Sequence, residues 1–209
     1  MLKVDTVHLI ISLSSRPSRC TLSPMPYPSK TDRQTILTTA MEQTAREGIE
    51  NLAIRSVATA LHLAPNALYR YFANLSALKA ALAEESRILL LKVLQKAAGA
   101  KAPEEAIRSI ARAYVRFARE KPHVFALTLM PSTPEAEENG AHRESWRFML
   151  GQVARIYGET RAPEAAVALW AFLHGMTILE AAGVFGELKP ASSFEFGLQM
   201  WIGAASAER

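Results

Sequence analysis

The segment from residue 52 to residue 72, LAIRSVATALHLAPNALYRYF, constrains the fold of this chain more than any other. Apolar residues recur at helical spacing over residues 54–61, which predicts a short amphipathic helix. Pro65 suits the first turn of a second helix over residues 65–72, because its missing N–H would be unpaired there. Helices this short are not stable alone in water, and the break between them has the length of a helix-turn-helix, whose second helix enters the DNA major groove.

Geometry within this unit selects the residues of the DNA face, because Leu61, Leu68 and Phe72 are expected to point inward. On the outer side, an Asn can pair with adenine, an Arg with guanine and an Ala methyl with the thymine methyl. Tyrosine hydroxyls more readily donate to phosphate, which sets the register without reading sequence. The candidate DNA-contacting residues are Arg55, Thr59, Ala64, Pro65, Asn66, Ala67, Tyr69, Arg70, Tyr71 and Lys79.

Several of these residues have a structural alternative. Tyr71 would instead pack against the helix that precedes the unit, and Arg55, Thr59 and Lys79 would be ordinary solvated surface. His62 lies in the turn and is expected to be a loop histidine rather than a ligand.

The run over residues 58–61, the sequence Pro-Asn-Ala-Leu-Tyr-Arg-Tyr-Phe at 65–72 and Leu78 resemble the N-terminal DNA-binding domain of the TetR family of transcriptional regulators. The Leu-Tyr-x-Tyr-Phe ending is the most specific part of the resemblance. It implies an all-α homodimer of about nine helices per subunit, with a three-helix DNA-binding head and a larger ligand-binding and dimerisation body. By the same resemblance Tyr69 is the stronger phosphate contact.

Three positions depart from the usual pattern of this family. Ala53 and Ala64 stand where members often place a Ser or Thr that caps a helix, and the loss of such a cap typically costs about 1 kcal/mol. Leu75 stands where a phosphate-binding Lys is common. These departures keep a second function open: a dimeric ligand-binding or interaction module with a vestigial DNA-binding head.

The first 29 residues differ from the rest of the chain. A short apolar run at 7–13 precedes a Ser- and Pro-rich stretch, and a secretory signal is disfavoured because His8 and Ser12 interrupt that run. We expect a disordered leader, or a start assigned upstream of a true start at Met25, so that residues 1–24 would not belong to the natural protein. The predicted domains are this leader, residues 1–29, the head, residues 30–80, and the body, residues 81–209.

The charge of the chain gives weak evidence of DNA binding. The formal net charge is +4 and the pI is about 9.3, but residues 1–30 hold four basic side chains against one acidic side chain. The remainder is nearly balanced, so any electrostatic footprint depends on the local placement of Arg and Lys. Cys20 is the only cysteine, which excludes an internal disulfide and suits the cytoplasm.

Gly, Pro and charged residues at typical start and stop positions predict the bounds of the other helices. The first is expected to start with a capping box at Thr31 and Gln34 and to end at Gly48. A long helix from Leu75 to Gly99 would join head and body, so that a ligand-induced shift of the body can move the head. The remaining helices are expected at residues 103–121, 122–130, 135 or 144 to 157, from 163 onward, and 192–207.

The helix that Pro163 opens carries no charged residue from position 165 to position 179, which is typical of a buried helix. A membrane span needs about 20 apolar residues, and His174, Thr177 and Glu180 interrupt this one, so no membrane partner is expected. We expect this helix and the last helix to pack against their copies in a twin subunit, as a four-helix interface of a two-fold dimer.

The sequence WAFLHG at residues 170–175 resembles the Trp-His-Gly segment in the C-terminal domain of one TetR subgroup. His174 would line a pocket or, as the favoured alternative, be a core histidine bonded to backbone, with Gly175 allowing close helix contact. A mostly apolar pocket for an unidentified small molecule is expected, although its residues are equally plain core candidates. They are Tyr114, Phe117, Phe125, Met130, Trp146, Phe148, Met149, Trp170 and His174.

No motif of an enzyme is found. A Gly-rich phosphate loop, a nucleophile elbow and metal-ligand spacing of Cys and His are all missing from the sequence, so no catalytic residue, metal or cofactor is expected. The sequence predicts a cytoplasmic homodimer that binds a near-palindromic operator in double-stranded DNA. We expect a repressor that a small-molecule ligand releases from this operator.

Overall fold

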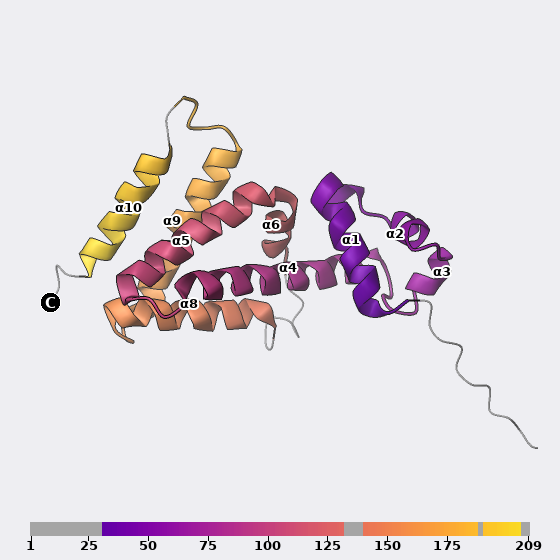
Figure 1. Ribbon diagram of the computed structural model, residues 1–209, viewed down its shortest axis with the longest axis horizontal. Helices are drawn as coiled ribbons and strands as arrows, with labels where there is room; N and C mark the ends of the chain where they lie inside the picture. The colour runs from indigo at the N-terminus through magenta and orange to yellow at the C-terminus, as the bar shows by residue number, and fades with distance from the viewer. Residues whose placement is uncertain (1–30, 132–139, 188–189, 206–209) are drawn as a thin grey trace, which may run out of the picture. The chain divides into compact units, whose positions relative to one another are not determined.

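The computed structural model describes residues 31–131, 140–187 and 190–205, so the predicted leader at 1–29 lies outside the described residues. Over the described ranges the chain is all-helical, which confirms the predicted fold class (Figure 1). The helices are α1 (Arg33–Glu47), α2 (Ile54–Ala60), α3 (Pro65–Leu68), α4 (Leu75–Ala98), α5 (Pro103–Glu120), α6 (Pro122–Thr128), α8 (Ala141–Tyr157), α9 (Ala162–Ala181) and α10 (Pro190–Ala204), with a short 3-10 turn, η1 (Ile49–Asn51).

The head consists of α1, α2 and α3 around a compact apolar core. Ile36 and Leu37 from α1, Val57 from α2 and Leu68 from α3 are all essentially inaccessible to solvent. The start of α1 differs from the predicted capping box: Asp32, not Thr31, is the N-cap, and its carboxylate accepts the Thr35 N–H at 2.7 Å. Asp caps a helix as well as Thr does. The predicted capping box required the helix to begin one residue earlier, with Thr31 as its N-cap.

The joint between α2 and α3 is closed by a Schellman motif. The Leu63 N–H donates to the Ala58 carbonyl and the His62 N–H to the Thr59 carbonyl, while His62 adopts a left-handed φ of 55°. His62 is thus a turn residue, as predicted. The second helix is shorter than the predicted 65–72, because regular α-helix ends at Leu68 and turns continue to Phe72.

Helix α4 joins the two cores. Its N-cap Asn74 accepts the Ala77 N–H at 2.8 Å, and it ends at Gly99, as predicted. Leu78 and Leu82, near its start, lie in the core of the head, whereas Leu94, near its end, lies in the core of the body. One rigid helix therefore contributes to both cores.

Helix α6 also joins the two cores, although it has only two turns. Val124 and Phe125 pack into the core of the body, while Leu127 is fully buried in the core of the head. Ser86 on α4 donates to the Val124 carbonyl, which fixes α6 against α4. A displacement of α6 would therefore disturb the packing of the head core directly.

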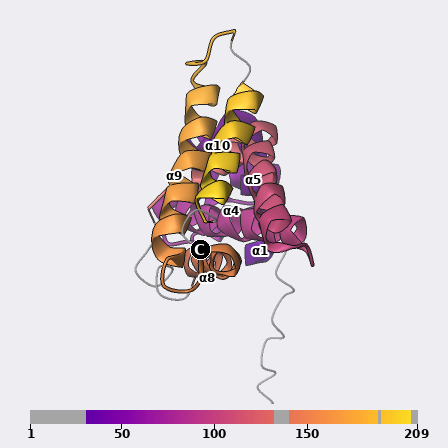
Figure 2. The same ribbon diagram turned by 90° about the vertical axis from the view of Figure 1, so that its left-hand side faces the viewer.

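The body is built from α5, α8, α9 and α10 around the second half of α4. Half of the residues of α5 are buried, and α9 and α10 lie side by side in both views (Figures 1 and 2). Their close approach depends on Gly197, where an added Cβ would lie 2.5 Å from the Phe172 ring. Three predicted helix ends in the body were wrong: α8 begins at Ala141, where the N-cap Gly140 has no side chain, and α10 begins at Pro190 and ends at Ala204.

Helix α9 is long and apolar enough to cross a membrane by length and composition, and it is the one helix among those described that meets this test. A helix in the core of a protein, or one that packs between subunits, meets the same test. Ala166, Leu169 and Leu173 lie in the core of the body, so this helix contributes one face to the subunit's own interior.

Candidate DNA-binding face and ligand cavity

The structure leaves most of the predicted DNA-contacting residues exposed on α2, α3 and the adjoining turns. Arg55, Thr59, Ala64, Pro65, Asn66, Tyr69 and Arg70 are exposed, while Ala67, Tyr71 and Lys79 are half-buried. Leu68 is fully buried between them, so α3 rests on the head core by one side and presents the other. The arrangement is suited to a groove-reading element, because amide, phenol and guanidinium groups are exposed on α3 and in the turn that follows it.

The side chain of Tyr71 has a structural role. Its hydroxyl donates to the Thr31 carbonyl at 2.8 Å, just ahead of α1. The guanidinium of Arg33 lies over the Phe72 ring, 5.1 Å from its centroid, at the same place. These contacts support the structural alternative for Tyr71, while its contact with DNA stays a prediction.

Neither helix of the helix-turn-helix has a side-chain cap. The N-caps of α2 and α3 are Ala53 and Ala64, and neither makes a side-chain hydrogen bond to the first turn. Helix α2 is held from the side instead, where the Ser56 hydroxyl donates to the Gln43 side chain at 2.9 Å and the Gln43 amide donates to the Ser56 carbonyl. The orientation of the unit therefore depends on tertiary contacts with α1.

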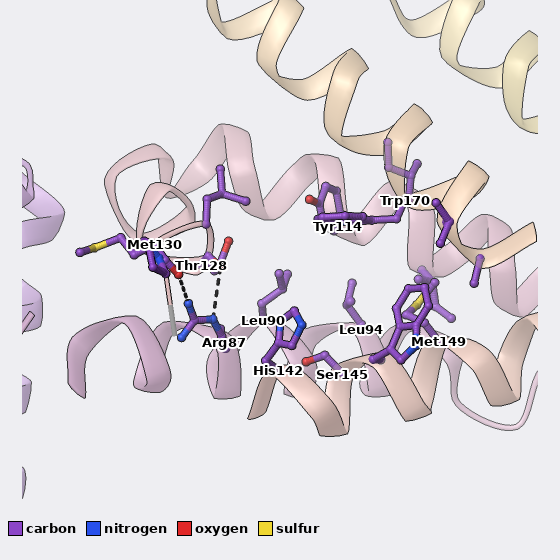
Figure 3. Close-up of a pocket in the computed structure, with 17 residues that line it drawn as sticks. Arg87, Leu90, Leu94, Tyr114, Thr128, Met130, His142, Ser145, Met149 and Trp170 are labelled. Carbon is purple, nitrogen blue, oxygen red and sulfur yellow. Dashed lines mark hydrogen bonds between the residues drawn. The ribbon is translucent and has the colours of Figure 1, made fainter. Parts of the chain in front are cut away.

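A cavity of about 560 Å³ lies in the body between α4, α5, α6, α8 and α9 (Figure 3). It reaches the surface, because Leu129, Val167 and Trp170 line it and are each more than 40% exposed. Its wall is mostly apolar, as is usual for small-molecule sites of this size. The lining residues are Arg87, Leu90, Leu94, Ile110, Tyr114, Thr128, Leu129, Met130, Pro131, His142, Ser145, Trp146, Met149, Ala166, Val167, Trp170 and Leu173.

Five of the nine predicted pocket residues line this cavity: Tyr114, Met130, Trp146, Met149 and Trp170. The other four do not. Phe117 and Phe125 are buried in the core of the body, Phe148 packs against that core, and His174 lies behind Tyr114 and Trp170. These positions could not be separated from the lining by sequence, because core and cavity residues share the same helical spacing.

His174 is half-buried, and its partner differs from the backbone partner that the favoured alternative expected. A hydrogen bond of 3.2 Å joins its Nδ1 to the Tyr114 hydroxyl rather than to backbone. Gly175 does not provide close contact, because a Cβ built there meets no described atom within 4 Å. Burial raises the pKa of Tyr114 to about 12, so this hydroxyl stays protonated at neutral pH.

Arg87 is the main residue of the cavity that sequence reasoning missed. It is only 6% exposed, and its Nε donates to the Thr128 carbonyl at 3.2 Å while its Nη2 donates to the Met130 carbonyl. Its Nη1 lies 3.6 Å from the Glu84 carboxylate, one helical turn away on α4. The signal was present in the sequence, because a charged residue at a helix position that repeats with Leu91 and Leu94 must be paired when buried.

A further surface is apolar but unburied. It lies on α9, on α10 and in the residues just after α9, and consists of Val167, Trp170, Ile178, Leu179, Val184, Phe196 and Met200. Several large hydrophobic side chains exposed on two adjacent helices are typical of an interaction surface. Within the described ranges, no group of three His, Cys, Asp or Glu side chains is placed to hold a metal ion.

Comparison with known proteins places these features in a family context. Residues 36–85 match the family model "Bacterial regulatory proteins, tetR family", and residues 107–201 match "Tetracyclin repressor-like, C-terminal domain". An uncharacterized HTH-type transcriptional regulator of Mycobacterium tuberculosis is 28% identical over 170 residues, which are 80% of this chain and 78% of that protein.

Solved structures share the fold at low sequence identity. A Rhodococcus protein of unknown function superposes with a TM-score of 0.70 at 20% identity, over 87% of this chain and 98% of that one. The TetR variant of Acinetobacter baumannii in complex with minocycline gives a TM-score of 0.62 at 20% identity, over 86% and 98% of the two chains. Both confirm the arrangement of an N-terminal helix-turn-helix and a helical body.

Proposed function

The chain belongs to the TetR family of transcriptional regulators, and we propose that it is a repressor that leaves its operator when a small molecule fills the cavity. As a member of this family it carries a DNA-binding domain and is a regulator, not an enzyme. The proposal concerns the sign of regulation, the ligand and the residues that carry them.

The observation that carries the proposal is the position of the C-terminal end of α6. Met130 lines the cavity and also packs against the core of the head, and Leu127, one turn earlier, is fully buried in that core. A ligand that displaces this end must therefore repack the head. Such a ligand changes DNA affinity by the difference between its affinities for the two arrangements.

On the DNA side, we assign base readout to Asn66, Ala67 and Arg70 and phosphate contact to Tyr69. Exposure of Asn66 on α3 and of Tyr69 and Arg70 in the turn that follows supports this assignment. Arg55, Thr59 and Lys79 would add contacts with phosphate. The same face would repeat in a twin subunit, and a near-palindromic operator follows when the two recognition helices lie about 34–36 Å apart, or a multiple of that distance.

For the dimer interface we propose α9 and α10. Exposed Val167, Ile178, Phe196 and Met200 support this choice, since they would be covered when the two helices pack against their copies. The Trp170 and His174 positions also support membership of the Trp-His-Gly subgroup. A cytoplasmic location follows from the proposed function, because the operator lies on the chromosome.

A second candidate is a dimeric ligand-binding or interaction module whose head no longer binds DNA. The missing caps at Ala53 and Ala64 favour it, because a helix-turn-helix without them is oriented less firmly. The two candidates share the cavity and differ in the activity of the head.

Binding of the purified protein to its own upstream intergenic DNA, titrated across salt, separates the two candidates. We expect competitor-resistant binding that Arg70→Ala weakens by about 1–3 kcal/mol with relaxed sequence preference. Tyr69→Ala should weaken binding to all sequences alike and leave the salt dependence nearly unchanged, because a phenol hydroxyl carries no charge. The matched control is Arg116→Ala, which removes an exposed arginine from α5. Binding no tighter than to random DNA would favour the second candidate.

A further inference from the structure

We propose that the ligand of the cavity is an organic acid, with an apolar or aromatic body and one carboxylate that pairs with the guanidinium of Arg87. The inference rests on the proposed function, since it names the class of ligand for that regulator. It depends on the charge of the cavity wall, on the position of Arg87 and on the aromatic side chains at the other end.

Among the described residues that line the cavity, Arg87 and His142 are basic and none is acidic. Arg87 is a permanent cation, and His142 is the other side chain of the wall that can carry positive charge. Tyr114 is protonated at neutral pH because burial raises its pKa to about 12. A ligand cation would thus meet a like charge, and no acidic side chain of the described lining would face it, which disfavours its binding.

The guanidinium of Arg87 is held in place with donors to spare. Of its five N–H groups, two donate to carbonyls in the described part of the chain, those of Thr128 and Met130. Glu84 offsets its charge only partly: the nearest oxygen lies 3.6 Å from Nη1, beyond hydrogen-bond distance, and the other accepts the Ala141 N–H. Glu84 does not line the cavity, so the wall presents the cation and not its partner.

The two ends of the cavity differ in character (Figure 3). Arg87 lies at one end, beside Thr128 and Met130, while Met149 and Trp170 lie at the other. An amphipathic acid matches this polarity, with its carboxylate at Arg87 and its body against the aromatic end. The volume of about 560 Å³ is within the range of sites that take drug-sized molecules.

Pairing of a carboxylate with Arg87 has a consequence for the head. The same guanidinium holds the carbonyls at the end of α6, and a carboxylate is a stronger acceptor than a carbonyl. A carboxylate on the spare N–H groups therefore draws the guanidinium away from the carbonyl of Met130, a residue that packs against the core of the head. The charged group of the ligand, rather than its bulk, should weaken DNA binding.

The test uses two series of small molecules, one aromatic and one aliphatic, and each series consists of a carboxylate, an alcohol and an amine. The aromatic series is 3,3-diphenylpropanoate, 3,3-diphenylpropan-1-ol and 3,3-diphenylpropylamine, and the aliphatic series is decanoate, 1-decanol and decylamine. Binding to the full chain is followed by tryptophan fluorescence, because Trp146 and Trp170 line the cavity, and by calorimetry. We expect the carboxylate of at least one series to bind about tenfold or more tighter than its alcohol, and the amine to bind weakest.

Arg87→Gln should reduce the preference for carboxylate over alcohol to less than about threefold, and Arg116→Gln should preserve it. If Arg87→Gln does not fold, the charge series on the natural chain still decides. Equal or tighter binding of the alcohol or amine, or no binding by any of the six compounds, would overturn the inference.

A DNA-binding assay separates this inference from the proposed function. If the protein binds its operator and no carboxylate binds the cavity preferentially, the ligand class is wrong and the regulator stands. If carboxylates bind as expected but operator binding is absent, the ligand class stands and the regulator is wrong.

Discussion

The head and the body of this protein obtain their stability in different ways. In the head, the two helices of the helix-turn-helix are short: α2 has seven residues and α3 has four. In the body, α5 has 18 residues and α9 has 20, and pairs of charged side chains join α5 to its neighbours, Arg112 with Glu195 at 2.7 Å and Arg119 with Glu180 at 2.8 Å. Those pairs are exposed and contribute little, so the length and burial of the helices stabilise the body.

The core of the head is completed by residues from outside its three helices. Leu78 and Leu82 come from α4 and Leu127 from α6, and all three are fully inaccessible. Helices as short as α2 and α3 would not form alone, so the reading unit exists only while α4 and α6 hold it. This dependence exposes the head to changes that begin in the body.

The largest expected effect comes from Leu127→Ala, which removes the contribution of α6 to the head core. The cavity left behind should cost about 2–5 kcal/mol of stability. Hydrogen exchange measured by mass spectrometry should show faster exchange in α1 to α3, together with weaker DNA binding. Leu198→Ala, an equally buried leucine of the body, is the control and should mainly affect the body. If each variant sped up hydrogen exchange equally in the head and in the body, the two regions would not be stabilised separately.

The second effect concerns pH and the body. Because burial raises the pKa of Tyr114 to about 12 from about 10 in the unfolded chain, the protonated hydroxyl stabilises the folded state. This contribution is fully present below pH 10 and is lost between about pH 10 and pH 12, and it amounts to roughly 2–3 kcal/mol. Urea titrations across this range should show a steeper loss for the natural chain than for Tyr114→Phe. Parallel curves would mean that Tyr114 titrates normally.

Gly197→Ala should destabilise the contact between α9 and α10. Its Cβ would lie 2.5 Å from the Phe172 ring, so the ring or the helix must move, at a cost of about 1–3 kcal/mol. Gly151→Ala is the matched control, because a Cβ on this exposed residue of α8 meets nothing within 4 Å and should stabilise the helix by about 0.5–1 kcal/mol. Thermal unfolding compares the two variants. A neutral result for Gly197→Ala would show that this contact yields easily.

The smallest expected effect is a gain in the head. Ala53→Ser places a hydroxyl at the N-cap of α2, whose extended backbone suits a cap, and should add about 0.5–1 kcal/mol. Ala102→Ser makes the same change at the N-cap of α5 in the body. Hydrogen exchange should slow in the head for the first variant and in the body for the second. A global slowing by Ala53→Ser would indicate that head and body unfold together.

The sequence predicted the helices well and their ends less well. Strong signals gave the right boundary at both ends of α4, where the Asn74 side chain caps the start and Gly99, with a positive φ of 50°, closes the end. The start of α1 and the end of α3 were missed by one to four residues, because Asp32 competes with Thr31 as a cap and because α3 ends in turns rather than at a stop residue. Ends without a side-chain signal are decided by tertiary contacts.

Local pattern by itself determined the all-helical fold, the helix-turn-helix and the exposed side of α3, because helical spacing and turn residues act over a few positions. Only the tertiary structure separated Tyr114, which lines the cavity, from Phe117 and Phe125, which do not. The tertiary structure also decided the partners of Arg87, because they are carbonyls about 40 residues along the chain. Core and cavity positions share one periodicity, and a cavity exists only where helices distant in sequence leave space between them.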